Sequence, residues 1–240
     1  NLLVNNWHQA FLIGFLPLIL AVCCIFILKE SDDWRESRNK QEREKVRANA
    51  EDRSKLLKGS IIFGSMLIGL WGMFSWIPTW VQSLLVDSTG QTERGIAMML
   101  LGAGGLTGGF ISGWVSNSLG VRRAMMLCFS GCITMSVLLF GLNDTFSSII
   151  YFELALLSLF FGISQGLLSI YIPQLFPVRI RGTYTGICFN IGRIVTALAI
   201  FFVGVMVSAL GGYSNALLTF TGIFVAGFIT VFLTNKKEKK

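Results

Sequence analysis

The chain has 240 residues, of which 53% are hydrophobic and only 14% are charged. Soluble domains carry about 25% charged residues, so this composition excludes an ordinary soluble domain. The net charge of +7 does not indicate a nucleic-acid partner, because the basic residues gather in short segments between long apolar runs. These runs are continuous, and a run of ~18 residues can cross a bilayer core of ~30 Å, which predicts an all-α polytopic membrane protein.

Seven membrane helices are expected, in chain order at 9–28, 60–86, 95–117, 124–142, 147–175, 183–210 and 216–233, with Pro78 interrupting the second. A charged segment separates the first helix from the other six. The predicted organisation is therefore a lone helix in 1–28, a charged linker in 29–59 and a six-helix bundle in 60–240. Within the linker, Glu51 and Lys55 are i,i+4 partners, which favours an exposed helix. The six helices suit two three-helix repeats, as in many secondary transporters.

The basic residues alternate between the loops. The segment 29–58 holds ten Lys and Arg, and further clusters follow the third, fifth and seventh helices: Arg122 and Arg123, Arg179 and Arg181, and Lys236, Lys237, Lys239 and Lys240. The other loops hold only Arg94. Because cytoplasmic loops carry the excess of Lys and Arg, Asn1 is expected outside, with the linker and the C-terminus in the cytoplasm. The predicted location is the cytoplasmic membrane, inner or plasma.

The helix expected at 95–117 carries small residues at helical spacing. Gly105, Gly109 and Gly113 recur every four residues, and so do Gly104 and Gly108. Small residues at this spacing let two helices approach closely, so we expect tight packing there.

The remaining composition gives no sign of catalysis. The five cysteines, Cys23, Cys24, Cys128, Cys132 and Cys188, lie inside the apolar runs, where we expect buried apolar side chains rather than disulfides. No nucleophile–base pair, metal-ligand cluster or nucleotide-binding loop is visible in the sequence. The sequence therefore predicts neither an enzyme nor a metal or cofactor site.

Two ionisable side chains fall inside predicted spans. Arg193 lies about ten residues into the sixth helix, roughly mid-membrane at ~1.5 Å per residue, and a charge there costs at least ~2.5–3.5 kcal/mol. Arg193 is either satisfied by backbone carbonyls or is the counter-ion of an anionic substrate or of a coupling carboxylate. Glu153, about two turns below the outer surface, is either an interfacial residue or a proton-coupling carboxylate and the partner of Arg193.

Other side chains suit a substrate path. Trp71, Phe74 and Pro78 are expected to share a face near mid-membrane, where they form either lipid-facing packing or the border of a cavity. Gln82 follows on the same helix. Gln165 and Asn190 lie at depths where they can hydrogen-bond hydroxyls or a carboxylate.

Three motifs occur along the chain. The segment 113–123 reads GWVSNSLGVRR, 173–183 reads PQLFPVRIRGT with NIGR following at 190–193, and 29–34 reads KESDDW. The first resembles the signature loop of the major facilitator superfamily. The second resembles the Pro-Glu-x-Phe-Pro-Thr-x-x-Arg-Gly-Thr pattern of its sugar and metabolite–proton symporters, with their following Asn-x-Gly-Arg. The third resembles their Pro-Glu-Ser-Pro-x-Trp.

The resemblance covers the whole chain and implies helices six to twelve of a twelve-helix transporter, so the chain looks like a piece of a longer protein that lacks its N-terminal half bundle. It also implies that the second, third, fifth and sixth helices surround the substrate path. Finally, it implies a cytoplasmic gate motif made of Gly113, Asn117, Gly120, Arg122, Arg123, Gln174, Arg179, Arg181 and Gly182.

In the family, acidic and basic residues of these cytoplasmic loops form a charge network that latches the two halves together. Asn117 and Gln174 are neutral at positions where the family has Asp and Glu. The resemblance therefore implies a weaker latch, or one that acids of the missing half complete.

The expected function is secondary active transport, driven by protons, of a small polar metabolite, organic acid or sugar by alternating access. Arg193 favours a carboxylate substrate. The alternatives are a truncated non-transporting or sensor-like membrane protein and a facilitator without ion coupling. The expected partners are the small-molecule substrate, protons, the lipid bilayer and the missing half bundle.

Overall fold

The computed structural model describes residues 15–27, 49–85, 90–178 and 180–234. The chain forms two units, Asn1–Arg47 and Ala48–Lys240, and each is described by itself. In the first unit, α2 (Leu16–Ile27) is an apolar helix within the expected span 9–28, of which 9–14 and 28 lie outside the described residues. Cys23 and Cys24 are exposed on α2, contrary to the expectation of burial, whereas the three cysteines of the second unit are buried.

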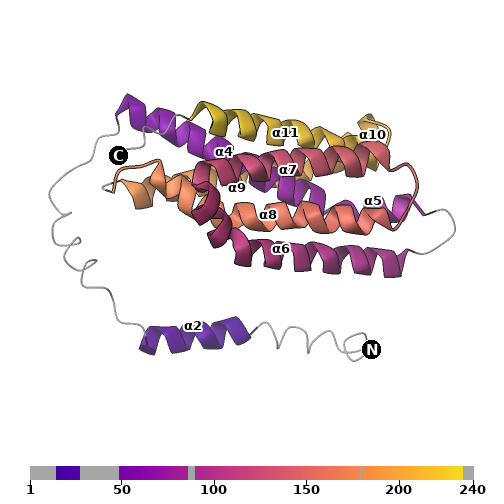
Figure 1. Ribbon diagram of the computed structural model, residues 1–240, viewed down its shortest axis with the longest axis horizontal. Coiled ribbons are helices and arrows are strands. Elements are labelled where there is room, and N and C mark those ends of the chain that lie inside the picture. The colour runs from indigo at the N-terminus through magenta and orange to yellow at the C-terminus, as the bar shows by residue number, and fades with distance from the viewer. Residues whose placement is uncertain (1–14, 28–48, 86–89, 179, 235–240) are drawn as a thin grey trace. The chain divides into compact units, whose positions relative to one another are not determined.

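The described part of the second unit is helical throughout, without strands (Figure 1). Its helices are α4 (Ala50–Phe74), α5 (Ile77–Ser83), α6 (Gln91–Leu119), α7 (Val121–Leu142), α8 (Ile149–Gln174), α9 (Arg181–Phe201), α10 (Val203–Ala209) and α11 (Tyr213–Leu233). Six of them, α4, α6, α7, α8, α9 and α11, are long and apolar enough to cross a membrane. Together with the shorter α2, they confirm the predicted all-α polytopic fold.

The first long helix begins well before the expected position 60. The backbone N–H of Asn49 donates to Asp52 Oδ2 at 3.2 Å, which is half of a capping box at the start of α4. One turn further, Lys55 Nζ lies 2.7 Å from Glu51 Oε1, the i,i+4 pair that the sequence predicts. Residues 50–59 therefore belong to the same helix as the span that was expected to begin at residue 60.

Two expected spans are each divided into a long and a short helix. α4 ends at Phe74 and α5 begins at Ile77, with Pro78 in its first turn. In a continuous helix, Pro78 would have no N–H for the Phe74 carbonyl, and its ring would clash with that carbonyl. The interruption by Pro78 is therefore confirmed. The division of 183–210 between α9 and α10 was not predicted from the sequence.

The main packing pairs of the long helices are preserved when α4, α6 and α7 are exchanged for α8, α9 and α11. α6 packs on α8 as α9 packs on α4, α7 packs on α8 as α11 packs on α4, and α7 packs on α11. This is the pattern expected of two three-helix repeats related by a two-fold axis, because every contact then has a counterpart. α4 and α8 are the most buried spans, and α6 and α9 are the least buried.

Glycines lie where α6 crosses α8 and where α9 crosses α4. In each case the second helix of one repeat meets the first helix of the other. A Cβ added to Gly108 of α6 would meet the α8 backbone, at the Leu159 carbonyl oxygen and, 2.8 Å away, at the Ile163 nitrogen. In the counterpart crossing, a Cβ on Gly192 of α9 would lie 3.3 Å from the Cα of Gly64 on α4. At Gly108 the two backbones are in contact, which only glycine allows, and at Gly192 they approach closely.

The other glycines of α6 fall into two groups. Gly104 faces Ser158 and the Ala155 carbonyl of α8, so the tight packing expected of Gly104 and Gly108 is confirmed. By contrast, a Cβ added to Gly105, Gly109 or Gly113 would meet nothing within 4 Å among the described residues. One face of α6 is therefore open in this chain.

Candidate functional site

A cavity of about 480 Å³ lies between α4, α8 and α9. It is lined by Phe63, Leu67 and Trp71 of α4, by Gln165, Leu168 and Ser169 of α8, and by Phe189 and Arg193 of α9. Spacings of three and four residues on each helix explain why these side chains share one helical face. The structure thus brings together three of the residues singled out from the sequence: Trp71, Gln165 and Arg193.

Arg193 lies near the middle of α9. It follows the start of the helix at Arg181 by twelve residues, which is ~18 Å along an axis of ~32 Å. One turn earlier, Phe189 stacks on Phe63 of α4, with ring centroids 4.3 Å apart and planes inclined by 23°. The stacked pair lines the cavity, and Trp71 and Arg193 lie further along α4 and α9.

The cavity offers hydrogen-bond donors without acidic partners. Among the described residues, Arg193 makes no hydrogen bond or ion pair. The Nε2 atom of Gln165 is buried and has no hydrogen-bond partner either, and none of the lining residues is Asp or Glu. A buried donor without an acceptor costs ~1–3 kcal/mol. This lining therefore suits a ligand that brings acceptor oxygens and a negative charge, such as a carboxylate.

Two other candidate residues do not line this cavity. Asn190 is exposed beside it on α9, and Phe74 packs edge-on against Phe161 of α8, with ring centroids 5.1 Å apart. Because α4 ends at Phe74, the helical period does not continue to Pro78. The structure therefore does not place Trp71, Phe74 and Pro78 on one face, contrary to the sequence-based expectation.

Glu153 lies away from Arg193. The Asn143 side chain, just beyond α7, donates from Nδ2 to Glu153 Oε2 at 2.8 Å. Glu153 lies 21 residues before the end of α8, whereas Arg193 lies twelve residues into α9, so the two differ in height by ~14 Å. The structure does not bring them together, and the partner that it gives Glu153 is Asn143.

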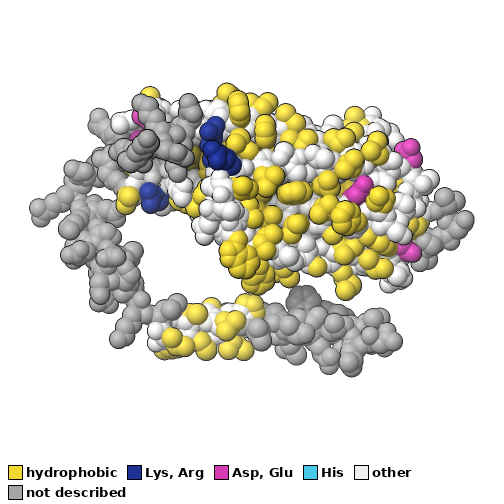
Figure 2. Space-filling model, viewed as in Figure 1, with side chains coloured by type: hydrophobic (Ala, Val, Ile, Leu, Met, Phe, Trp, Pro, Cys, Tyr) yellow, Lys and Arg dark blue, Asp and Glu magenta, His cyan; other side chains and the backbone are white. Residues whose placement is uncertain are grey.

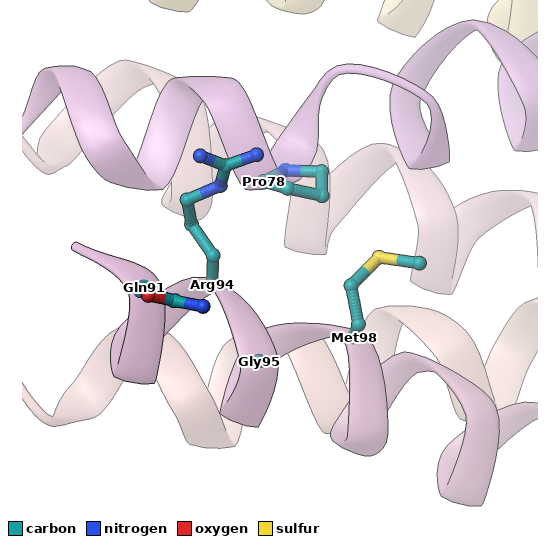
Figure 3. Close-up of a pocket in the computed structure, with 5 residues that line it drawn as sticks. All are labelled: Pro78, Gln91, Arg94, Gly95 and Met98. Carbon is teal, nitrogen blue, oxygen red and sulfur yellow. The ribbon is translucent and has the colours of Figure 1, made fainter. Parts of the chain in front are cut away.

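A second cavity, of about 540 Å³, lies between α5 and α6. Figure 3 shows the residues that line it: Pro78 of α5 and Gln91, Arg94, Gly95 and Met98 of α6. Arg94 Nη1 donates to Gln82 Oε1 at 2.8 Å. Two candidates from the sequence, Pro78 and Gln82, therefore gather around Arg94 and not around Arg193.

The expected gate motif lies at the end of the second unit where α6 passes into α7, which we call the basic end. Gly120, the single residue between the two helices, has φ +78°, a conformation that side chains disfavour. The remaining described motif residues other than Arg122 are exposed: Gly113, Asn117, Arg123, Gln174, Arg181 and Gly182. On the face shown in Figure 2, the Lys and Arg side chains, in dark blue, lie at this end.

Two arginines of the motif bind backbone carbonyls. Arg122 donates from Nε to the Val231 carbonyl at 3.3 Å and from Nη2 to the Phe232 carbonyl at 2.5 Å. These are the last carbonyls of α11, where a positive charge is favoured. Arg181 Nε donates to the Phe176 carbonyl at 3.3 Å. Arg122 thus joins α7 to α11, the third helices of the two repeats.

We expect Arg122→Gln to lower the unfolding temperature of the detergent-purified protein by a few degrees, because two charged hydrogen bonds worth about 1–2 kcal/mol are lost. Arg123→Gln removes the same charge from the neighbouring residue, whose side chain is exposed, and is expected to leave the melting temperature unchanged. Equal melting curves for the two variants would contradict a stabilising role of the Arg122 contacts.

Some residues of interest lie outside the described ranges. These are Arg179 of the gate motif, the 29–34 motif and the basic cluster in 235–240. The effect of the neutral Asn117 and Gln174 on a latch stays a prediction.

Six apolar spans, with a mid-span arginine lining a cavity, define a multi-pass membrane protein. Residues 2–200 match the model of the Major Facilitator Superfamily, and the chain belongs to this family. The resemblance drawn from the three motifs is confirmed. The family also supports the prediction of a transporter rather than an enzyme.

Several curated transporters are similar to the chain. It is 23% identical to the cis,cis-muconate transport protein of Acinetobacter baylyi, over 98% of this chain and 58% of that protein. It is 31% identical to the sialic acid transporter NanX of Escherichia coli, over 79% of this chain and 46% of that protein. It is 28% identical to the niacin transporter NiaP of Acinetobacter baylyi, over 92% of this chain and 56% of that protein. The chain thus spans about half the length of these relatives.

Proposed function

We propose that the protein is a secondary active transporter of a small organic acid, and that the cavity around Trp71, Gln165 and Arg193 binds the substrate carboxylate. One observation carries this proposal. Arg193 and Gln165 line the same cavity, and neither Arg193 nor the buried Nε2 of Gln165 has an acceptor among the described residues. A carboxylate supplies two acceptor oxygens and the opposite charge, so it offsets both costs at once.

The names of the relatives favour an acid over a neutral sugar. Muconate, sialic acid and niacin differ in size and shape, but each carries a carboxyl group. A sugar hydroxyl would accept from Gln165 but would leave the charge of Arg193 uncompensated. Phe63, Phe189 and Trp71 provide an apolar surface for the body of the substrate.

Alternating access in this proposal involves the part of the full-length protein beyond this chain. The least buried spans, α6 and α9, would face that part of the protein, and the open glycine face of α6 would lie against it. The basic end would face the cytoplasm, because Lys and Arg are concentrated there. The membrane would be the cytoplasmic membrane.

We further propose that protons drive the transport. Among the described residues, no acid lines the cavity, and Glu153 lies away from it beside Asn143. A coupling carboxylate is therefore expected from the rest of the protein rather than from Glu153.

Uptake by cells that express the full-length protein tests the proposal. Radiolabelled nicotinate, cis,cis-muconate, N-acetylneuraminate and, as a neutral control, glucose would be compared with and without a protonophore. We expect at least one acid to accumulate, the protonophore to abolish its accumulation, and glucose to be excluded. Uptake of glucose but of no acid would contradict the proposal. Acid uptake that the protonophore leaves unchanged would identify an uncoupled facilitator, and no uptake of any compound would favour a non-transporting protein.

A further inference from the structure

The cavity between α5 and α6 is separate from the carboxylate cavity. Arg94 is the fourth residue of α6, near the end of the unit opposite the basic end. Measured along the helices, it lies ~20 Å farther from the basic end than Arg193. Figure 3 shows its guanidinium extending from α6 toward Pro78 of α5, with Gln91 and Met98 one turn away on either side. No residue is shared between the linings of the two cavities.

Arg94 retains most of its hydrogen-bonding capacity. Its described partner is the neutral Oε1 of Gln82, at 2.8 Å, and a guanidinium has five N–H donors. Among the described residues, no acid lines the cavity. The cavity also adjoins the first turn of α6, whose N-terminal backbone amides favour an anion. Three independent features therefore favour a negatively charged ligand.

The surrounding charges make this position unusual. Among the described residues, Arg94 is the only Lys or Arg at this end of the unit, whereas Glu93, Asp144 and Glu153 are acidic. An anion that approaches this end meets repulsion from the carboxylates and attraction at Arg94 alone.

We propose that the Arg94 cavity is an entry site, where the carboxylate of an anionic substrate binds before it reaches the cavity of Arg193. The proposal rests on the function proposed above. It assigns Arg94 a role in capture, separate from the role of Arg193 in the central cavity. Gln82 positions the Arg94 guanidinium through its hydrogen bond.

Thiol labelling tests this site without requiring transport. Met98 lines the cavity and is 52% exposed, whereas the adjacent Met99 is 75% exposed and does not line it. Met98→Cys and Met99→Cys would each be made in full-length protein with Cys23→Ser and Cys24→Ser, because the other cysteines of the chain are buried. Each variant would react with an anionic and a cationic methanethiosulfonate reagent of similar size.

At Met98→Cys we expect the anionic reagent to be favoured, and Arg94→Gln to reduce that preference about threefold to fivefold, the range of an exposed charge pair. Arg94→Lys should keep the preference, and 0.5 M salt should remove it, as roughly expected from screening. Nicotinate should slow the labelling of Met98→Cys but not of Met99→Cys, and nicotinamide should slow neither. Protection by nicotinate should persist in Arg193→Gln, because the two cavities are separate.

The entry site and the proposed function fail in different ways. An anionic preference that is unchanged in Arg94→Gln, or equal at Met98→Cys and Met99→Cys, would overturn the entry site even if acids are transported. Protection that disappears in Arg193→Gln would also overturn it, since the protection would then arise from the central cavity. Preserved labelling preferences in a protein that takes up no acid would support an anion site and contradict the function proposed for it.

Discussion

Arg193→Gln is expected to abolish acid uptake while leaving a folded protein. The substitution removes the charge that the cavity presents to a carboxylate but keeps a polar side chain of similar reach. Loss of the charged hydrogen-bond partner of a bound carboxylate costs about 2–4 kcal/mol, which corresponds to a roughly 30- to 1000-fold weaker affinity. Arg193 has no partner among the described residues, so the melting temperature should not fall.

Two further variants make the Arg193 result specific. Arg193→Lys keeps the charge without the planar fork that binds a carboxylate at two points, so an intermediate affinity is expected. Arg53→Gln removes one positive charge from an exposed side chain in the first turn of α4 and should leave uptake unchanged. Uptake by Arg193→Gln within about threefold of the wild type, less than a single exposed charge pair is worth, would contradict the assigned role.

Gly108→Ala is expected to destabilise the protein strongly. The new Cβ would collide with the α8 backbone, including the Ile163 nitrogen at 2.8 Å and the Gly162 Cα at 2.9 Å, and backbone within a packed helix cannot move aside. Overpacking of this kind costs about 1–3 kcal/mol or more. Gly222→Ala on α11 is the control, because a Cβ there meets nothing within 4 Å and alanine favours the helix.

Thermal unfolding in detergent, read by fluorescence-detected size exclusion, measures both glycine variants. A lower melting temperature or a loss of folded protein is expected for Gly108→Ala, and an unchanged or higher melting temperature for Gly222→Ala. If the two variants unfolded alike, the α6–α8 crossing would not depend on a backbone contact at Gly108.

Features that depend on local sequence were predictable. Continuous apolar runs fix the spans, Pro78 fixes the break after Phe74, and the four-residue spacing of Gly104 and Gly108 indicates close packing. Arg193 and Gln165 stand out because polar side chains are rare in apolar runs. Their apolar neighbours in the cavity do not stand out in the sequence. Lipid is as apolar as a protein core, so composition alone does not distinguish the lipid-facing side of a helix from its buried side.

Features that depend on how helices pair were not predictable. Phe63 and Leu67 precede Trp71 at steps of four, and Phe189 precedes Arg193 by the same step, but only the meeting of α4, α8 and α9 shows that these faces enclose a cavity. The pairing of Glu153 with Arg193 was expected from their positions along consecutive helices. It fails because α8 and α9 place them at different heights. Likewise, Arg122 reaches α11 because of the repeat packing, and the motif contains no sign of that contact.

The most direct test of the carboxylate cavity is equilibrium binding to the purified full-length protein. The acid that is transported best would be compared with its uncharged primary amide, in the wild type and in Arg193→Gln. We predict that the wild type binds the acid at least ~30-fold more tightly than the amide, and that this preference disappears in Arg193→Gln. An equal affinity of the wild type for acid and amide, or a preference for the acid that survives the loss of Arg193, would contradict this prediction.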